Sequence, residues 1–191
     1  MVTPLNVAVL VGSLHKDAYS RKIAHVLVGL PPASLDCRIV EMADLPLYTE
    51  DLDSAPPASW TRFRAEIQGA DAVLIVTPEY KRSIPGGLKN AIDVGSRPSY
   101  HSVWMACPPR GQCLTVQTGW IRRDRHVRQS LVFLNMPIMQ QQEAYLPEVA
   151  GILDEGGALV SAEFREFLTK VISSFAAWAQ TLVATRFCKS A

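Results

Sequence analysis

One continuous stretch, residues 71–93, constrains the fold of this 191-residue chain more than any other. Residues 71–76 form an apolar run rich in β-branched side chains, which is typical of a buried strand. The chain then turns at Pro78 and enters a predicted helix, with Pro85 near the first turn, where a missing N–H costs nothing. Because open α/β sheets bind ligands in the loops that follow their strands, this stretch predicts an α/β fold with a ligand site at 77–85.

Strands and helices are predicted to alternate along the whole chain. Strands are expected at 6–11, 37–42, 71–76 and 113–118, with a short fifth strand beginning at 136–139. Helices are expected at 20–30, 60–68, 85–95, 122–134 and 162–182. Such alternation implies parallel pairing through right-handed crossovers. It predicts a single domain, residues 1–191, built as a three-layer sandwich around a five-stranded parallel sheet of order 2-1-3-4-5.

Composition narrows the class of function. The formal net charge of +1 argues against nucleic-acid binding, and 48% hydrophobic residues agree with a well-packed core. No apolar run is expected to span a bilayer, and the N-terminus lacks a signal-peptide pattern, so a cytoplasmic protein without membrane contact is predicted. The four cysteines show no metal-binding spacing and are expected to be free thiols, the alternative being a Cys107–Cys113 redox pair. No metal site is predicted.

The loop that follows the first strand, residues 12–21, is a candidate phosphate site. It contains neither a dinucleotide fingerprint nor a P-loop motif. It does contain the hydroxyls of Ser13 and Ser20, the bases His15, Lys16 and Arg21, and the free N–H groups of a helix start. These groups suit a terminal phosphate. The alternative is a polar turn in which Ser20 is the N-cap.

Two motifs resemble the NADPH-dependent FMN reductases. Residues 77–93 are similar to the pattern T-P-E-Y-N-x-S-x-P-G-x-L-K-N-x-I-D, and the loop at residue 12 is similar to G-S-L-R-x-G-S-x-N-R-K. The resemblance continues at 128–145 and 163–178. It implies a flavodoxin-like fold, bound FMN, NADPH or NADH as hydride donor, a small-molecule acceptor (a quinone, azo compound, chromate or free flavin) and a homodimer or homotetramer.

The resemblance also implies which residues contact FMN. They are Ser13, His15, Tyr19 and Ser20 around the phosphate, Pro78, Glu79, Tyr80 and Lys81 along the isoalloxazine, and Thr118 and Gly119 in a third wall. No catalytic residue is assigned, because the flavin carries the chemistry. Glu79 is expected to be structural rather than a general acid.

The chain departs from the family pattern at several of these positions. His15 replaces an arginine, and Ala18 and Ser20 replace a serine and an asparagine, which predicts weaker and more pH-dependent FMN binding. Lys81 replaces an asparagine; it either favours the anionic reduced flavin or points to solvent. Residues 105–119 differ from the pattern throughout.

Two further alternatives stay open at this stage. The chain is either an FMN-dependent NAD(P)H oxidoreductase or a flavodoxin-like electron carrier without turnover, although a carrier is usually strongly acidic. Arg122, Arg125 and His126 share one helix face, which is either an anion-docking site or a solvated surface.

Overall fold

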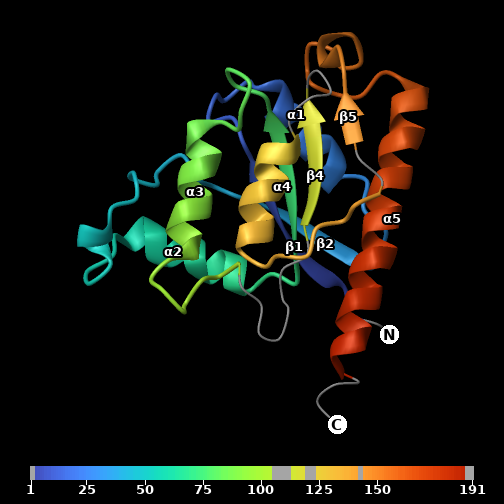
Figure 1. Cartoon of the computed structure of the whole chain (residues 1–191). Helices are drawn as coiled ribbons and strands as arrows, with labels where there is room; N and C mark the ends of the chain where they lie inside the picture. Colours follow the sequence, from blue (N-terminus) through green and yellow to red (C-terminus); the bar gives the residue numbers. More distant parts are fainter. Residues whose placement is uncertain (1–2, 105–112, 119–123, 142–143, 188–191) are drawn as a thin grey trace.

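The protein is described here by a computed structural model, which covers residues 3–104, 113–118, 124–141 and 144–187 (Figure 1). Within these residues, five strands form one parallel sheet in the order β2-β1-β3-β4-β5. Their bounds are β1 Leu5–Val11, β2 Leu35–Val40, β3 Ala72–Pro78, β4 Cys113–Thr118 and β5 Ala144–Leu146. The predicted flavodoxin-like α/β fold class is confirmed.

Helices cover both faces of this sheet. The described α-helices are α1 Tyr19–Val28, α2 Ala58–Gln68, α3 Gly86–Ser96, α4 Asp124–Phe133 and α5 Ala162–Phe187. Two short 3₁₀ turns, η1 Glu50–Leu52 and η2 Val149–Gly151, lie in the connections. Figure 1 shows α2, α3 and α4 on one side of the strands and α5 on the other.

The alternation of side chains along β1 divides the core into two halves. Val7, Val9 and Val11 pack with α1 and α5, whereas Ala8 and Leu10 pack with α2, α3 and α4. Successive residues of a strand point to opposite faces, so a sheet covered on both sides is apolar along its whole length. This is why β1 and β3 read as continuous apolar runs in the sequence.

The fifth strand lies later in the chain than the sequence analysis predicts. Residues 136–139 form the connection between α4 and β5, and the strand itself is Ala144–Leu146. Pro137 has no N–H to donate to a sheet ladder, and Asn135 leaves α4 at φ 54°. Met136 and Met139 are buried as expected, but in this connection rather than in a strand.

The expectation that no segment is long and apolar enough to span a membrane also needs correction. Among the described residues, Ala162–Ala184 of α5 meets the length and composition of a membrane span. The helix buries Leu168, Val171, Ile172 and Phe175 in the core beneath the sheet. A core helix passes the same test, so the observation is weak support for a membrane span.

Candidate functional site

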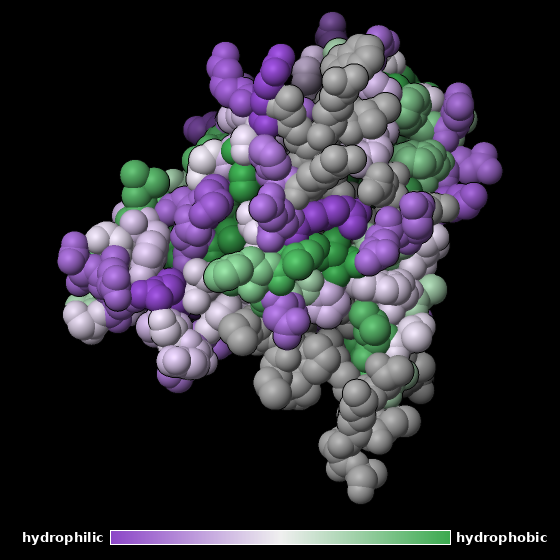
Figure 2. All heavy atoms as spheres, viewed as in Figure 1, coloured by the Kyte–Doolittle hydropathy of each residue, from purple (hydrophilic) through white to green (hydrophobic). Residues whose placement is uncertain are grey.

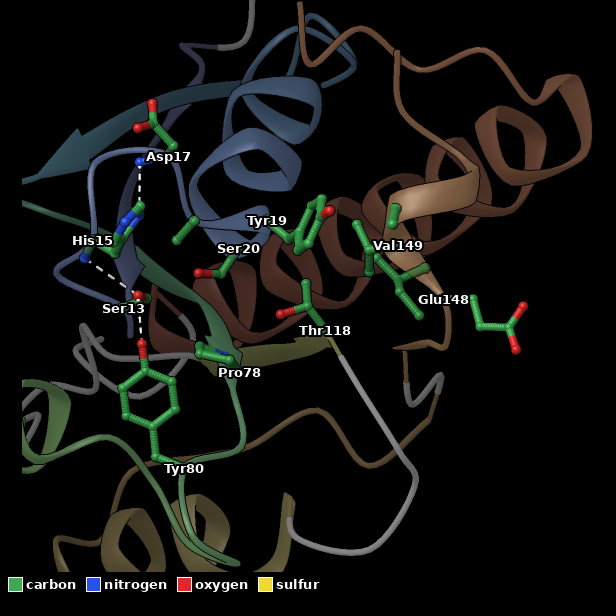
Figure 3. A pocket seen from close by; sticks show the side chains of 13 residues that line it. Ser13, His15, Asp17, Tyr19, Ser20, Pro78, Tyr80, Thr118, Glu148 and Val149 are labelled. Carbon is green, nitrogen blue, oxygen red and sulfur yellow. Dashed lines mark hydrogen bonds between the residues drawn. The ribbon is translucent and has the colours of Figure 1, made fainter. Parts of the chain in front are cut away.

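A cavity of about 640 Å³ opens at the edge of the sheet where the strands end (Figure 3). Its wall is built by the loops that follow β1, β3 and β5, together with Thr118 at the end of β4. Thirteen residues line it: Ser13, His15, Asp17, Ala18, Tyr19, Ser20, Pro78, Tyr80, Thr118, Leu146, Glu148, Val149 and Ala150. The carboxyl edge of a parallel sheet is where such folds bind ligands, so this cavity is the candidate site.

The loop after β1 begins with Gly12, at a position that only glycine can occupy. Gly12 donates its N–H to the carbonyl of Val76 at 2.9 Å, which brings it close to β3. A Cβ at this position would lie 2.1 Å from Thr77 Oγ1 and 2.7 Å from Thr77 Cβ. The missing side chain therefore lets the loop leave the sheet directly beside the loop that follows β3.

Ser13 joins the two loops. Its side chain is buried, and its Oγ lies 2.8 Å from the hydroxyl of Tyr80, which stands across the cavity wall (Figure 3). Ser13 Oγ also accepts the N–H of His15 at 3.3 Å. Two loops separated by more than sixty residues are thereby held together at the cavity by one pair of hydroxyls.

The imidazole of His15 has a defined hydrogen-bonding role. The Asp17 N–H donates to His15 Nδ1 at 3.1 Å, so Nδ1 is an acceptor and the proton of the neutral ring is on Nε2. Nε2–H is left as a donor at the cavity wall. An imidazole offers one donor here, whereas an arginine would offer a fork of several.

Helix α1 begins at the cavity without a side-chain cap. Its N-cap residue is Ala18, whose side chain makes no capping bond, and the first N–H groups of a helix have no partner within it. Ser20 lies in the first turn, so the alternative in which Ser20 is the N-cap is wrong. Its Oγ is buried and has no hydrogen-bond partner in the described structure. In Figure 3 this hydroxyl points into the cavity.

An orphaned buried hydroxyl beside an uncapped helix N-terminus fits a phosphate. The hydroxyl would donate to a phosphate oxygen, and the helix dipole favours negative charge at this end. A buried donor left without a partner costs about 1–3 kcal/mol, which a bound anion would recover. The donors present at this loop therefore match the phosphate end of FMN.

Arg21 is not among the residues that line the cavity. Its guanidinium instead links α1 to Glu41, directly after β2. It forms two parallel hydrogen bonds with Glu41, at 2.8 and 2.9 Å. These bonds hold the pKa of Glu41 below its usual range and raise that of Arg21. The ion pair thus fixes the orientation of the helix that carries Ser20.

The fold brings most, but not all, of the predicted site residues to the cavity. Seven of the ten line the cavity: Ser13, His15, Tyr19, Ser20, Pro78, Tyr80 and Thr118. Glu79 and Lys81 lie in the same loop but outside the cavity wall, and Lys81 is exposed. Gly119 lies outside the described residues, as do Cys107 and the rest of 105–112 within the divergent segment 105–119.

The fold adds a wall that the sequence analysis missed. Leu146, at the end of β5, and Glu148, Val149 and Ala150 after it line the cavity. In Figure 3 Glu148 and Val149 lie on the side opposite Tyr80. Glu148 takes a left-handed backbone conformation at φ 53° and ψ 43°. These residues were missed because β5 was expected eight residues earlier, and no motif marks them.

Asn90 has a structural role in the fold. Its Oδ1 accepts the Tyr48 N–H at 2.8 Å, and its Nδ2 donates to the carbonyls of Leu45 and Pro46. It therefore fastens the segment after β2 to α3. Asn90 thus braces the loop after β2.

The fold and cavity define a parallel α/β protein with an anion-accepting pocket, which is the arrangement of a flavodoxin-like flavoprotein. The NADPH-dependent FMN reductase family model matches residues 5–151. The chain therefore belongs to this family, and the predicted oxidoreductase class with FMN and NAD(P)H is confirmed at the level of the family.

Similar proteins point the same way. A quinone reductase from Pseudomonas putida is 51% identical over 91% of this chain and 94% of its own length. A 2-hydroxy-1,4-benzoquinone reductase from a Burkholderia species is 38% identical over 91% of this chain and 96% of its own. The structure of FerB, a flavoenzyme NAD(P)H:(acceptor) oxidoreductase from Paracoccus denitrificans, superposes with a TM-score of 0.83 at 31% identity, covering 93% of this chain and 98% of that one.

Proposed function

We propose that this protein is an FMN-dependent NAD(P)H oxidoreductase that reduces quinones in the cavity at the carboxyl edge of its sheet. Azo compounds, chromate and free flavin are the further acceptors to test. The single observation that carries the proposal is the buried hydroxyl of Ser20 at the uncapped start of α1, inside this cavity, for which the described residues supply no hydrogen-bond partner. It is the donor arrangement that a phosphate-bearing cofactor requires.

Three side chains and the start of α1 would hold the phosphate of FMN. Ser13 and Ser20 supply hydroxyl donors, and His15 supplies Nε2–H. The first N–H groups of α1 complete the set. Asp17 lies at the rim, and its backbone N–H keeps the imidazole in the tautomer that donates.

The remaining wall would shelter the flavin ring. Pro78 ends β3 and Tyr80 follows it, Thr118 ends β4, and Val149 follows β5, so apolar and hydroxyl groups surround the middle of the cavity. When bound, FMN would accept a hydride from NAD(P)H and pass it to the acceptor. The protein's own contribution is to bind, orient and exclude water rather than to donate a proton at an assigned residue.

The electron-carrier alternative is less well supported. A carrier docks its partners by strong charge, but this chain has a net charge of +1. The relatives with high coverage carry the names of reductases. The reductase therefore remains the proposal, and the carrier becomes an outcome of the test.

The test is an anaerobic titration of the purified protein with FMN, then with NADPH, followed by a benzoquinone. We expect a bound flavin band that bleaches on addition of NADPH and returns with the quinone. A bound flavin that NADPH does not bleach would support the carrier, and no flavin binding would overturn the proposal. As a check on the phosphate site, the S20A variant should weaken FMN binding, whereas S173A, on α5, should not.

We also propose that the chain forms a homodimer through α3 and α4. Phe133 is 90% exposed and Val132 is 67% exposed, next to a groove between the two helices. Figure 2 shows hydrophobic side chains gathered in a band across this face. Light scattering should give the mass of a dimer for the wild-type protein and of a monomer for F133D; a monomeric wild type would overturn this part.

A further inference from the structure

The loop that follows Tyr80 carries two adjacent cations in an unusual backbone conformation. Tyr80 and Ser83 exchange both of their backbone hydrogen bonds, each at 2.9 Å, around Lys81 and Arg82. Lys81 has φ 46° and Arg82 has φ 71°. A two-residue turn with both central residues at positive φ is a type I′ turn, which usually contains Asn-Gly. Here it contains Lys-Arg.

This conformation opposes the intrinsic preference of both residues. The left-handed region costs an ordinary L-residue about 1–2 kcal/mol, and only glycine, asparagine and aspartate enter it readily. Strain of this kind persists at functional sites because the surrounding structure imposes it. The turn therefore carries its two charges at some expense in stability.

The two cations are exposed, and the described part of the chain holds no acidic partner for either of them. Lys81 and Arg82 both lie at the surface, and the ion pairs found among the described residues involve neither of them. Some other arginines that the structure describes are paired with a carboxylate, as Arg21 is with Glu41 and Arg97 with Glu50. Because no carboxylate of the described residues neutralises them, Lys81 and Arg82 can bind an anionic ligand.

The turn is held at both of its ends, by the candidate site on one side and by α4 on the other. On one side the Tyr80 ring lines the cavity and its hydroxyl bonds Ser13. On the other side Ser83 Oγ lies 3.0 Å from Nδ1 of His126 on α4. Lys81 and Arg82 therefore lie at the rim of the cavity, on the side that faces α4.

The charges around the cavity favour binding of an anionic group at the rim that carries Lys81 and Arg82. The side chains that line the cavity include two carboxylates, Asp17 and Glu148, and one imidazole, His15. In Figure 3 Glu148 lies across the cavity from Tyr80. A bound molecule with an anionic group outside the cavity is repelled on the Glu148 side and attracted on the side of Lys81 and Arg82.

We propose that Lys81 and Arg82 bind the 2′-phosphate of NADPH and make this enzyme prefer NADPH over NADH. The inference rests on the proposed function, since the nicotinamide must enter the cavity. The adenosine half of the nucleotide then extends over the rim, where the 2′-phosphate, which NADH lacks, meets the two cations. Arg82 offers a planar fork of donors that matches a phosphate, and Lys81 adds a point charge.

The test compares the wild type with the double variant K81N/R82N. Asparagine tolerates positive φ, so the variant removes both charges while keeping the turn. We expect kcat/KM for NADPH to fall by about tenfold and that for NADH to change by less than about twofold. The fall should come from KM, and the ionic-strength dependence of the NADPH reaction should weaken. The charge-conserving variant K81R/R82K should keep the preference.

A second measurement does not depend on turnover. Calorimetric titration of the wild type should show tighter binding of 2′,5′-ADP than of 5′-AMP, and K81N/R82N should lose that difference. The control is K170N, which removes an exposed cation from α5, far from the turn in Figure 1. K170N should behave as the wild type in both measurements.

The outcomes separate this inference from the proposed function. An unchanged ratio of the NADPH and NADH kcat/KM values in K81N/R82N, with turnover intact, would overturn the inference alone. Equal binding of 2′,5′-ADP and 5′-AMP by the wild type would also overturn it. Failure of both nucleotides to bleach the flavin of the wild type would instead overturn the proposed function.

Discussion

The hydroxyls of Ser13 and Tyr80 lie 2.8 Å apart and connect the loop after β1 to the loop after β3. Ser13 is almost completely buried, whereas Tyr80 is 47% exposed. The bond therefore joins a buried hydroxyl at the base of the cavity to a partly exposed aromatic side chain at its rim. Both residues belong to the two sequence motifs that first indicated the site.

Removal of the Ser13 hydroxyl should weaken FMN binding more than removal of the Tyr80 hydroxyl. S13A loses a donor to the phosphate, so we expect the Kd for FMN to rise about tenfold. Y80F leaves Ser13 free to serve the phosphate, so the change should be less than about threefold. Fluorescence titration with FMN measures both, and Y100F, at a residue 99% exposed, is the control. Equal losses in S13A and Y80F would show that Ser13 acts only through Tyr80.

Restoring an arginine at position 15 should tighten FMN binding. His15 presents a single Nε2–H, whereas H15R would supply a permanent charge and two parallel donors to one phosphate. We expect the Kd for FMN to fall about tenfold and to depend less on pH. H101R adds the same charge at an exposed position away from the cavity and should leave the Kd unchanged. An unchanged Kd in H15R would place the phosphate elsewhere.

A side chain at position 12 should destabilise the fold. The Cβ of G12A would meet Thr77 Oγ1 at 2.1 Å and Thr77 Cβ at 2.7 Å, both in a buried strand end. We expect a loss of about 3 kcal/mol in the free energy of unfolding, measured by urea denaturation. The loss should be smaller in a T77G background, because the clashing atoms are then absent. G86A, which meets nothing within 4 Å, should cost little.

The Arg21–Glu41 pair should make stability depend on pH in a defined direction. The hydrogen bonds from Arg21 lower the pKa of Glu41 in the folded state below its unfolded value. The pair therefore stabilises the fold above the unfolded pKa of about 4.3, and this contribution is lost as the pH falls through the folded pKa. The Glu41 side chain is 54% exposed, so E41Q should cost less than about 1 kcal/mol at pH 7.

The measurement is the difference in free energy of unfolding between wild type and E41Q as a function of pH. It should be largest at neutral pH and shrink toward zero below about pH 4. E166Q, at an exposed position of α5 without an ion pair among those described, should show no such trend. A difference that grows on acidification would contradict the assigned sign.

The sequence by itself determined the fold class and both loops of the site. Hydrophobic periodicity is local, so β1, β3 and the helices that follow them could be placed from their own residues. The two site loops, which begin at Gly12 and Thr77, each carry a run of polar residues that could be recognised as a motif from the sequence alone. Seven of the ten residues expected at FMN therefore line the cavity.

The tertiary structure alone decided three features: the cavity wall formed after β5, the unpartnered Ser20 hydroxyl within the described residues, and the turn at Lys81 and Arg82. Glu148 and Val149 reach the cavity only because the three-residue strand β5 pairs with β4, and so short a strand has no periodicity to read. Ser20 is unpartnered because helix α1 begins one residue before it, and a helix boundary is set by packing. Lys81 and Arg82 have positive φ because Tyr80 and Ser83 are fixed by long-range contacts with Ser13 and His126. Contacts between residues far apart in the chain leave no local pattern, and this is why the sequence could not show them.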